Sequence, residues 1–410
     1  MSYALIFRAY PDIDHMAPLA WKLLEEGEDV HVVLSPGLRV IGDHRLEHLA
    51  HYPRLRTWDA GTRAWRRSLP WALWLLGRHR VRVVAVEWGS GLSAGWERPL
   101  SPAGFVSVLR AVARSVVRRR EPRQLRLNFM VAARLLGRAT ICLPHGLSIK
   151  LAGAPGHDQT FPWQDRNRFA AYVLNTEHHR EWFLSNAGGD PSVMQTWGSL
   201  RWAPEWAQLN HRLAPPFGWP ADGRPLRVVF MVPKWGNAVD GDAVLDLVRR
   251  LQALDEVSLV VKGHPRPEDG SADPLRDDPA IDWSVVHDGT RADSVALIAA
   301  ADVVVDVGSS IGIEALTQGR LLVNPSYLHG VTTLFDVVPG SCAVAATPDE
   351  VVELLRRSAA GDRPQIADDA RDELLRRAVY ASRPEPFDVL DTYVTNVRRL
   401  ALAHDDQGDR

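Results

Sequence analysis

Residues 302–316, DVVVDVGSSIGIEAL, place an apolar run directly before a Gly-Ser-Ser turn and a helical pattern. The run has the length and valine content of a buried strand. Gly308, Ser309 and Ser310 follow it at once, and free N–H groups at a helix start favour an anion. Glu314 lies one turn after Ser310, where it could accept hydrogen bonds from a ribose. The alternative is an ordinary N-cap by one of the serines.

The same alternation of apolar runs and helical patterns continues on both sides of this stretch. Such alternation predicts parallel sheets covered by helices on both faces. We therefore predict an α/β protein with two doubly wound, Rossmann-like domains. The expected strands lie at 3–9, 29–35, 81–88, 139–144, 170–175, 193–198, 227–233, 258–265, 283–289, 302–310 and 320–326.

A segment rich in proline and glycine, residues 213–225, is typical of an interdomain linker. We expect an acceptor-side domain at 1–212, a nucleotide-binding domain at 226–384, and a terminal helix and tail at 385–410. Ligands of such folds bind at the carboxyl ends of the strands, and the cleft between two domains is the expected place for a substrate.

The composition excludes several classes of protein. A net charge of -2 over 410 residues gives no general attraction to nucleic acid. The two cysteines lie in apolar runs and are too far apart for a CxxC zinc site. The N-terminus is expected to be a first strand rather than a signal peptide. P-loop, GxGxxG and HExxH motifs are absent from the sequence.

We predict a cytoplasmic location, because no apolar run of about 18 residues is present. Residues 63–82 hold three tryptophans between arginine clusters. They are expected to form a core helix before a strand. The alternative is an interfacial helix on the inner face of the membrane.

The chain has only four lysines, and three of them follow strand-like runs. Lys262 ends the run 258–262 and alternates with His264 and Arg266, so the three share one side of an extended segment. Such a group suits a phosphate, and a solvated turn is the alternative. Lys234 follows the first expected strand of the second domain.

The stretch 139–150, ATICLPHGLSIK, ends an expected strand on a His-Gly pair. His145 could take a proton from an attacking hydroxyl, and Gly146 lets a ligand approach the backbone. Lys150 could hold an anionic group nearby. A structural histidine is the alternative.

The stretch 10–16, YPDIDHM, supplies rival bases after the first expected strand. Asp14 and His15 would face the same cleft. Asp14 could instead be a helix N-cap.

Taken in their order along the chain, the His-Gly pair with Lys150, the segment around Lys234, the His264 segment and the Ser309-Ser310 turn resemble the motifs of the CDP-glycerol glycerophosphotransferases that polymerise teichoic acids. The segment 139–335 is also similar to capsule-synthesis transferases that use CMP-activated sugars. The resemblance implies the two-domain GT-B fold. It implies that His145 is the base and that His264, Ser309 and Ser310 contact donor phosphates. Gly308 stands where that family usually has a tyrosine.

The resulting hypothesis is a metal-independent, cytoplasmic transferase without a cofactor. It moves a sugar or polyol phosphate from a CDP- or CMP-linked donor to an acceptor hydroxyl in cell-surface polysaccharide synthesis. The expected partners are that donor and a glycan, lipid-linked or small-molecule acceptor, without nucleic acid. The alternatives are a UDP-sugar glycosyltransferase or a non-hydrolysing UDP-sugar 2-epimerase, and a degenerate homologue that only binds a nucleotide sugar.

Overall fold

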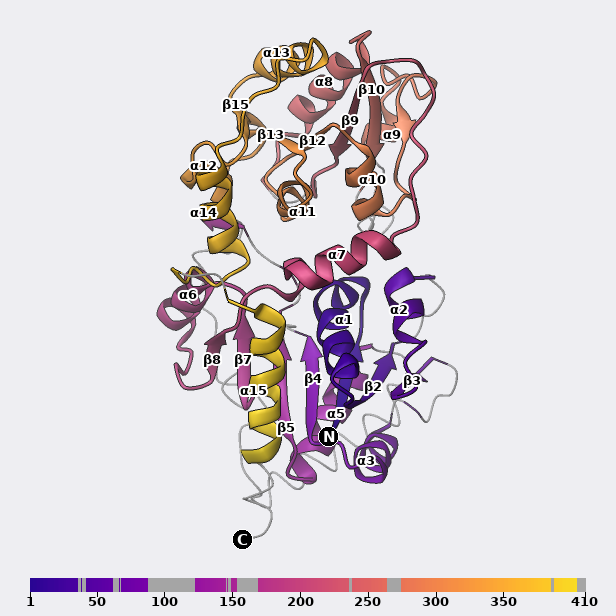
Figure 1. Cartoon of the computed structure of the whole chain (residues 1–410), viewed down its shortest axis with the longest axis vertical. Coiled ribbons are helices and arrows are strands. Elements are labelled where there is room, and N and C mark those ends of the chain that lie inside the picture. Colours follow the sequence, from indigo (N-terminus) through magenta and orange to yellow (C-terminus); the bar gives the residue numbers. More distant parts are fainter. Residues whose placement is uncertain are drawn as a thin grey trace. The chain divides into compact units, whose positions relative to one another are not determined.

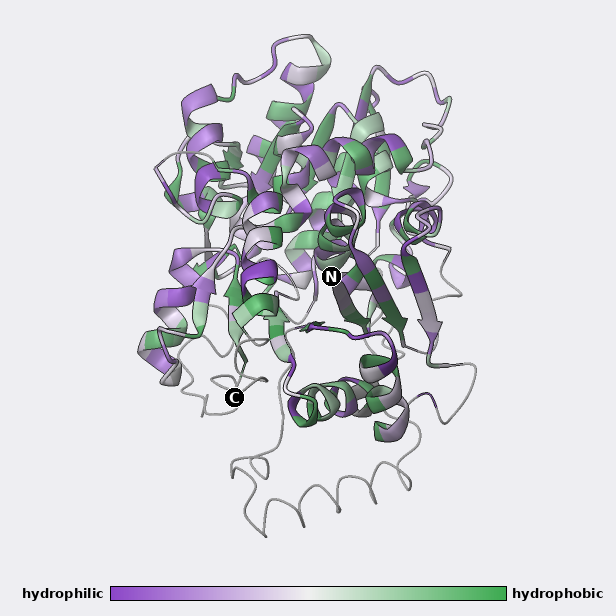
Figure 2. Ribbon diagram, turned by 60° about the horizontal axis from the view of Figure 1, so that its bottom comes forward, coloured by the Kyte–Doolittle hydropathy of each residue, from purple (hydrophilic) through white to green (hydrophobic). Residues whose placement is uncertain are grey.

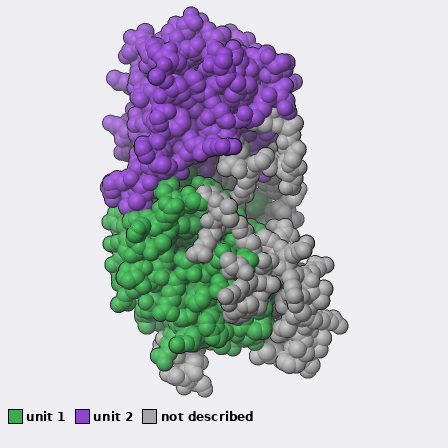
Figure 3. All heavy atoms as spheres, turned by 90° about the vertical axis from the view of Figure 1, so that its right-hand side faces the viewer, with its two compact units in different colours: residues 1–147, 160–206, 379–410 green, residues 148–159, 207–378 purple. Residues whose placement is uncertain are grey.

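The computed structural model describes most of the chain as two compact units (Figures 1 and 3). Unit 1 comprises residues 1–147, 160–206 and 379–410, and unit 2 comprises residues 148–159 and 207–378. The described residues are 1–35, 38, 42–61, 66, 68–87, 122–144, 146, 149–152, 169–235, 238–263, 274–384 and 387–403.

Unit 1 is built on a seven-stranded parallel sheet. Its strand order is β3-β2-β1-β4-β5-β7-β8. β1 is buried along its whole length, as a central strand covered on both faces requires. The strands are β1 (Ser2–Phe7), β2 (Asp29–Leu34), β3 (Leu55–Asp59), β4 (Val83–Glu87), β5 (Ala139–Leu143), β7 (Ala171–Leu174) and β8 (Met194–Thr196).

The helices of unit 1 bury apolar side chains against this sheet, and Trp71 of α3 and Phe129 of α5 meet in the core at 5.5 Å between ring centroids. The C-terminal helix α15 packs on α1 in the same unit. The Tyr393 hydroxyl of α15 donates to the Gly198 carbonyl at 3.0 Å. The helices are α1 (Tyr10–Glu25), α2 (His44–Leu49), α3 (Leu69–Arg78), α5 (Pro122–Leu135), α6 (Glu177–Ala187) and α15 (Val389–Ala403).

Unit 2 is built on a six-stranded parallel sheet of order β11-β10-β9-β12-β13-β15. A short antiparallel pair joins β6 to β14. The strands are β6 (Lys150–Ala152), β9 (Leu226–Met231), β10 (Val257–Lys262), β11 (His287–Asp288), β12 (Val303–Asp306), β13 (Leu321–Pro325), β14 (Thr332–Thr333) and β15 (Ala343–Ala345).

The helices of unit 2 are amphipathic: α8 buries Val244, Leu247, Val248 and Leu251 at helical spacing. Figure 2 shows helices that carry both hydrophobic (green) and hydrophilic (purple) residues. The helices are α8 (Gly241–Gln252), α9 (Pro274–Asp277), α10 (Ser294–Ala300), α11 (Ile311–Thr317), α12 (Leu334–Val337), α13 (Pro348–Ala359) and α14 (Asp368–Ala378), and α7 (Pro204–Leu213) starts in unit 1 and ends in unit 2.

In each sheet the direction of strand addition reverses once. The reversal lies between β1 and β4 in unit 1 and between β9 and β12 in unit 2. A crevice opens at the carboxyl ends of the strands at such a switch point, and ligands of open α/β sheets bind there. The segments that follow these four strands are therefore the places to look for a site.

The predicted fold class, α/β with two Rossmann-like parallel-sheet domains of the GT-B type, is confirmed. The expected strand at 283–289 is reduced to His287–Asp288. The short segment 148–159 belongs to unit 2, the chain passes into unit 2 again between residues 206 and 207 within α7, and the residues from 379 onward belong to unit 1. The helical pattern at 105–119 lies outside the described residues.

Among the described helices, none is both long and apolar enough to cross a membrane. The core-helix prediction for 63–82 holds for α3, whose Trp71 is buried. Trp74 on the same helix is 47% exposed.

Candidate functional site

The Gly-Ser-Ser loop follows β12 at the switch point of unit 2 and is held by a buried carboxyl group. Ser309 donates to Asp306 through its backbone N–H at 2.8 Å and through its hydroxyl at 2.6 Å. Burial raises the pKa of Asp306 to about 7, although hydrogen bonds from Ser309 and Gly312 act in the opposite direction. The Ser309 hydroxyl also accepts from the Ile311 N–H at 3.3 Å. Ser310 is the N-cap residue of α11, but its side chain makes no cap hydrogen bond, and the bond to the first helical N–H comes from Ser309 instead.

Gly308 has a φ of +60°, a backbone conformation that residues other than glycine rarely adopt. A Cβ at this position would lie 2.9 Å from His329 Nε2 and 3.1 Å from Thr333 Cγ2. The family tyrosine suggested by the resemblance therefore cannot occupy position 308 in this conformation.

His329 is a residue that the sequence analysis missed. Its Nδ1 lies 2.9 Å from the Val331 carbonyl, and burial lowers its pKa. The signal was present, because His329-Gly330 is a second His-Gly pair shortly after a strand.

Lys150 lies near this loop although it is far from it in sequence, and it interacts electrostatically with Lys234. β6 pairs with β14 so that Lys150 lies opposite Thr333, whose methyl group faces Gly308. The pKa of the half-buried Lys150 is lowered by burial and by Lys234, which follows β9. An anionic ligand relieves the repulsion between two such ammonium groups.

Lys262 and Glu314 are buried and take part in bonds within unit 2. The Lys262 ammonium donates to the Thr290 carbonyl at 2.9 Å, and burial lowers its pKa. Glu314 lies 3.1 Å from His211 Nε2 and accepts from the Gln318 amide at 2.9 Å. Both side chains therefore connect neighbouring segments of unit 2 by hydrogen bonds.

In unit 1, the stretch 10–16 forms the start of α1 rather than a loop. Ala9 is the N-cap, and Asp12 accepts from the backbone N–H groups of Arg8 and Ala9 at 2.6 and 2.9 Å. The interpretation of Asp14 as a helix N-cap is therefore wrong.

Asp14 instead forms ion pairs with Arg45 and Arg201. Burial alone would raise its pKa, but these arginines lower it to about 2. A carboxylate with so low a pKa is a weak base near neutral pH. His15 is buried beside Trp202.

A second group that the sequence analysis missed lies at the switch point of unit 1. Arg8 follows β1 and forms an ion pair with Glu87, the last residue of β4. Arg126 of α5 donates to the Glu87 carbonyl at 3.3 Å. Lone charges at strand ends carry no periodic signal, so only the pairing of β1 with β4 shows that they meet.

His145, His264 and Arg266 lie outside the described residues. Gly146 is described, and its carbonyl accepts a hydrogen bond from the side-chain amide of Asn175 at 3.0 Å. Asn175 is the residue that follows β7.

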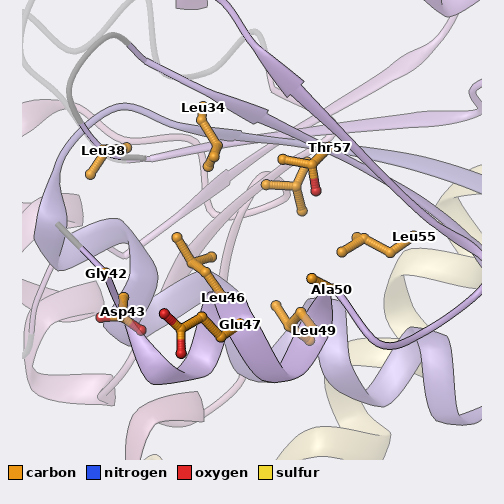
Figure 4. Close-up of a pocket in the computed structure, with 11 residues that line it drawn as sticks. Leu34, Leu38, Gly42, Asp43, Leu46, Glu47, Leu49, Ala50, Leu55 and Thr57 are labelled. Carbon is orange, nitrogen blue, oxygen red and sulfur yellow. The ribbon is translucent and has the colours of Figure 1, made fainter. Parts of the chain in front are cut away.

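A cavity of about 190 Å³ lies in unit 1, where α2 faces β2 and β3 (Figure 4). Leucines from both sides dominate its lining, among them Leu34, Leu46 and Leu55. The Asp43 carboxylate in its wall is held by Arg45. A lining of leucines with the carboxylates of Asp43 and Glu47 does not suit a phosphate. The described residues also contain no cluster of His, Cys, Asp or Glu that could hold a metal ion.

Comparisons with known proteins show the fold. No family model matches the chain, and no curated protein matches it. The structure is similar to UDP-GlcNAc 2-epimerase from Neisseria meningitidis bound to UDP-GlcNAc, with a TM-score of 0.54 at 12% identity over 98% of this chain and 99% of that one. It is also similar to UDP-GlcNAc 2-epimerase from Methanocaldococcus jannaschii, with a TM-score of 0.52 at 11% identity over 90% of this chain and 94% of that one. A glycosyltransferase from Rickettsia africae gives a TM-score of 0.54 at 8% identity over 97% of this chain and 98% of that one.

Proposed function

We propose that the protein is an enzyme that acts on a nucleotide-activated sugar or polyol phosphate and binds its nucleotide at the switch point of unit 2. The observation that carries the proposal is that Lys150 lies beside the loop 308–310, opposite Thr333, and interacts electrostatically with Lys234. Together they offer two ammonium groups and a serine hydroxyl at the place where open α/β sheets bind ligands. These groups supply positive potential without a metal ion, so we propose a metal-independent reaction.

We favour transfer to an acceptor hydroxyl in cell-surface polysaccharide synthesis. His145 would take the proton of the attacking hydroxyl, the bond to the leaving phosphate would break, and a sugar donor would be transferred with inversion. Asp14 is a poorer candidate for this role because its pKa is about 2. His15 remains the rival base, and His264 and Arg266 are proposed as further phosphate contacts.

A UDP-sugar 2-epimerase is the second candidate, favoured by the folds to which the structure is similar. Acid–base chemistry on the sugar calls for available carboxylates. Asp306, Glu314 and Asp336 lie at this edge of unit 2, and each accepts hydrogen bonds from its neighbours. Because these carboxyl groups already accept hydrogen bonds within the protein, the arrangement favours transfer over epimerisation.

The test is a thermal-shift panel of CMP, CDP, UMP, UDP, GDP and ADP, with and without magnesium. A ligand at 100 times its dissociation constant stabilises by about 2.7 kcal/mol. We expect stabilisation that does not need magnesium and is strongest with cytidine nucleotides. Lys150→Ala and Lys234→Ala should each weaken binding at least about tenfold, which corresponds to about 1.4 kcal/mol.

The matched control is Lys22→Ala, because Lys22 pairs with Glu205 and Asp391 in unit 1. It should leave the nucleotide shifts unchanged. A preference for uridine nucleotides would replace the cytidine donor with a UDP-sugar, and no shift with any nucleotide would contradict the proposal. His145→Ala should abolish turnover and keep donor binding, whereas a protein that only binds would be indifferent.

We also propose that the outer face of α3 contacts anionic membranes. Trp74 is 47% exposed there, and Arg56, Arg78 and Arg80 are exposed around it. Tryptophan and arginine together suit the headgroup region of a bilayer.

We expect co-sedimentation with phosphatidylglycerol vesicles that weakens several-fold in Trp74→Ala and at high salt. Leu402→Ala is the control, because Leu402 is 54% exposed on α15. Equal loss in both variants, or equal binding to phosphatidylcholine vesicles, would contradict a specific role for α3.

A further inference from the structure

We propose that the carboxyl edge of the sheet in unit 1 binds a polyhydroxylated ligand through Arg8, Glu87 and Asn175. The inference deepens the proposed function in one respect, because such a ligand would be the acceptor of the transfer. The site itself is argued from unit 1 alone.

The topology brings these three side chains to one edge. Arg8 follows β1 and Glu87 ends β4, the two strands between which the strand order reverses. Asn175 follows β7 on the same edge. Arg8 and Glu87 therefore stand at the switch point where the crevice of a doubly wound sheet receives a ligand, and Asn175 lies farther along the same carboxyl edge.

The site contains polar groups that the rest of the described chain does not satisfy. Glu87 is 1% exposed and Asn175 is 2% exposed. Among the described residues, Arg8 Nε and Asn175 Oδ1 are buried and have no hydrogen-bond partner. Buried polar atoms are nearly always paired, so each such atom calls for an explanation.

The chemistry of these two atoms defines the ligand. Arg8 Nε is a donor that needs an acceptor, and Asn175 Oδ1 is an acceptor that needs a donor. A hydroxyl group provides both. The charges of Arg8 and Arg126 are matched by those of Glu87 and Asp12, which does not favour a multiply charged anion.

The span of the row points to several hydroxyls rather than one. Three strand spacings separate β1 from β7 in the order β1-β4-β5-β7. At about 4.8 Å each, they amount to about 14 Å. An oligosaccharide or a long polyol chain bridges such a row, whereas a single small anion does not.

The side chains are also held in place by their neighbours. Glu87 is fixed by Arg8 and Arg126, and the Asn175 amide donates to the Gly146 carbonyl. The orientation of Asn175 follows from that bond, which leaves Oδ1 as the group without a partner. A ligand would therefore meet a preformed set of groups.

The experiment is saturation-transfer NMR on the full chain with sorbitol, methyl α-D-glucopyranoside and maltose as probes. We expect the wild type to bind at least one of them. Arg8→Lys keeps the charge beside Glu87 and removes the Nε donor, and Asn175→Ala removes the amide oxygen. Each should raise the dissociation constant at least tenfold. Arg54→Lys is the matched control, because Arg54 precedes β3 at the opposite edge of the sheet and donates to the Gly27 carbonyl.

Nucleotide thermal shifts measured on the same proteins separate the two proposals. Retained nucleotide shifts in Arg8→Lys with loss of probe binding support the site. Probe binding without any nucleotide shift would overturn the proposed function and keep the site. A wild type that binds no probe, or an Arg8→Lys variant that binds as the wild type does, overturns the site.

Discussion

Gly308→Ala is expected to lower the free energy of unfolding by roughly 2–4 kcal/mol and to abolish nucleotide binding. Two effects combine at this position. A side chain in the left-handed region costs about 1–2 kcal/mol. The added Cβ would also lie 2.9 Å from His329 Nε2 and 3.1 Å from Thr333 Cγ2. The loop 308–310 would have to move, and the proposed phosphate site would move with it.

Gly319→Ala is the matched control for this prediction. Gly319 has a φ of +65°, close to that of Gly308, and no heavy atom lies within 4 Å of its added Cβ. Denaturant unfolding should therefore show only the backbone cost of about 1–2 kcal/mol for Gly319→Ala. Equal losses in the two variants would show that His329 and Thr333 do not restrict position 308. Gly308→Tyr should lower the free energy of unfolding more than Gly308→Ala does. A stable, nucleotide-binding Gly308→Tyr variant would restore the family resemblance at this position.

The strand and helix pattern could be predicted because each element carries its own local signal. The run before Gly308 is apolar enough to be buried whatever surrounds it, and all four residues of β12 are buried. The Gly-Ser-Ser turn and the start of α11 follow from residue types that terminate strands and begin helices. These signals lie within about 15 residues of one another, which is the range that a sequence pattern can report.

The partners of the candidate residues could not be predicted, because they come from distant parts of the chain. Glu314 meets His211, and Asp14 meets Arg45 and Arg201. Each pairing depends on how helices pack, which residue spacing alone does not reveal. The same holds for Lys150, which follows the first stretch of unit 1 in sequence but belongs to unit 2 through the pairing of β6 with β14.

The role of Asp306, the carboxyl group at the end of β12, could not be predicted from the sequence. The Gly-Ser-Ser sequence predicts phosphate contacts by both serines, and it does not reveal that the Ser309 hydroxyl donates to Asp306. Ser309 therefore holds the loop through Asp306, so the protonation state of Asp306 is expected to affect the stability of the loop.

Asp306 is expected to make the protein less stable as the pH rises from about 4 to 7. Its pKa is about 7 in the folded state and ordinarily 3.8, so the folded state keeps a proton that the unfolded state has lost. Stability then falls by about 1.4 kcal/mol per pH unit in this window, to a total of about 4 kcal/mol, and is level below and above it. Asp306→Asn cannot ionise and should lack this component. Urea unfolding of both proteins between pH 4 and 8 measures the difference, which cancels the contributions of other groups.

Asp302→Asn is the control for Asp306→Asn, because Asp302 precedes the same strand and its pKa is lowered by the Arg227 hydrogen bonds despite partial burial. Since Asp302 is ionised in both states above about pH 5, its replacement should lower stability by a constant amount from pH 5 to 8. Ionised Asp306 also adds a negative charge behind Ser309, so nucleotide affinity should weaken above pH 7 in the wild type and not in Asp306→Asn. A wild type and an Asp306→Asn variant with parallel pH profiles would show that Asp306 is ionised throughout. The three donors from Ser309 and Gly312 would then outweigh burial.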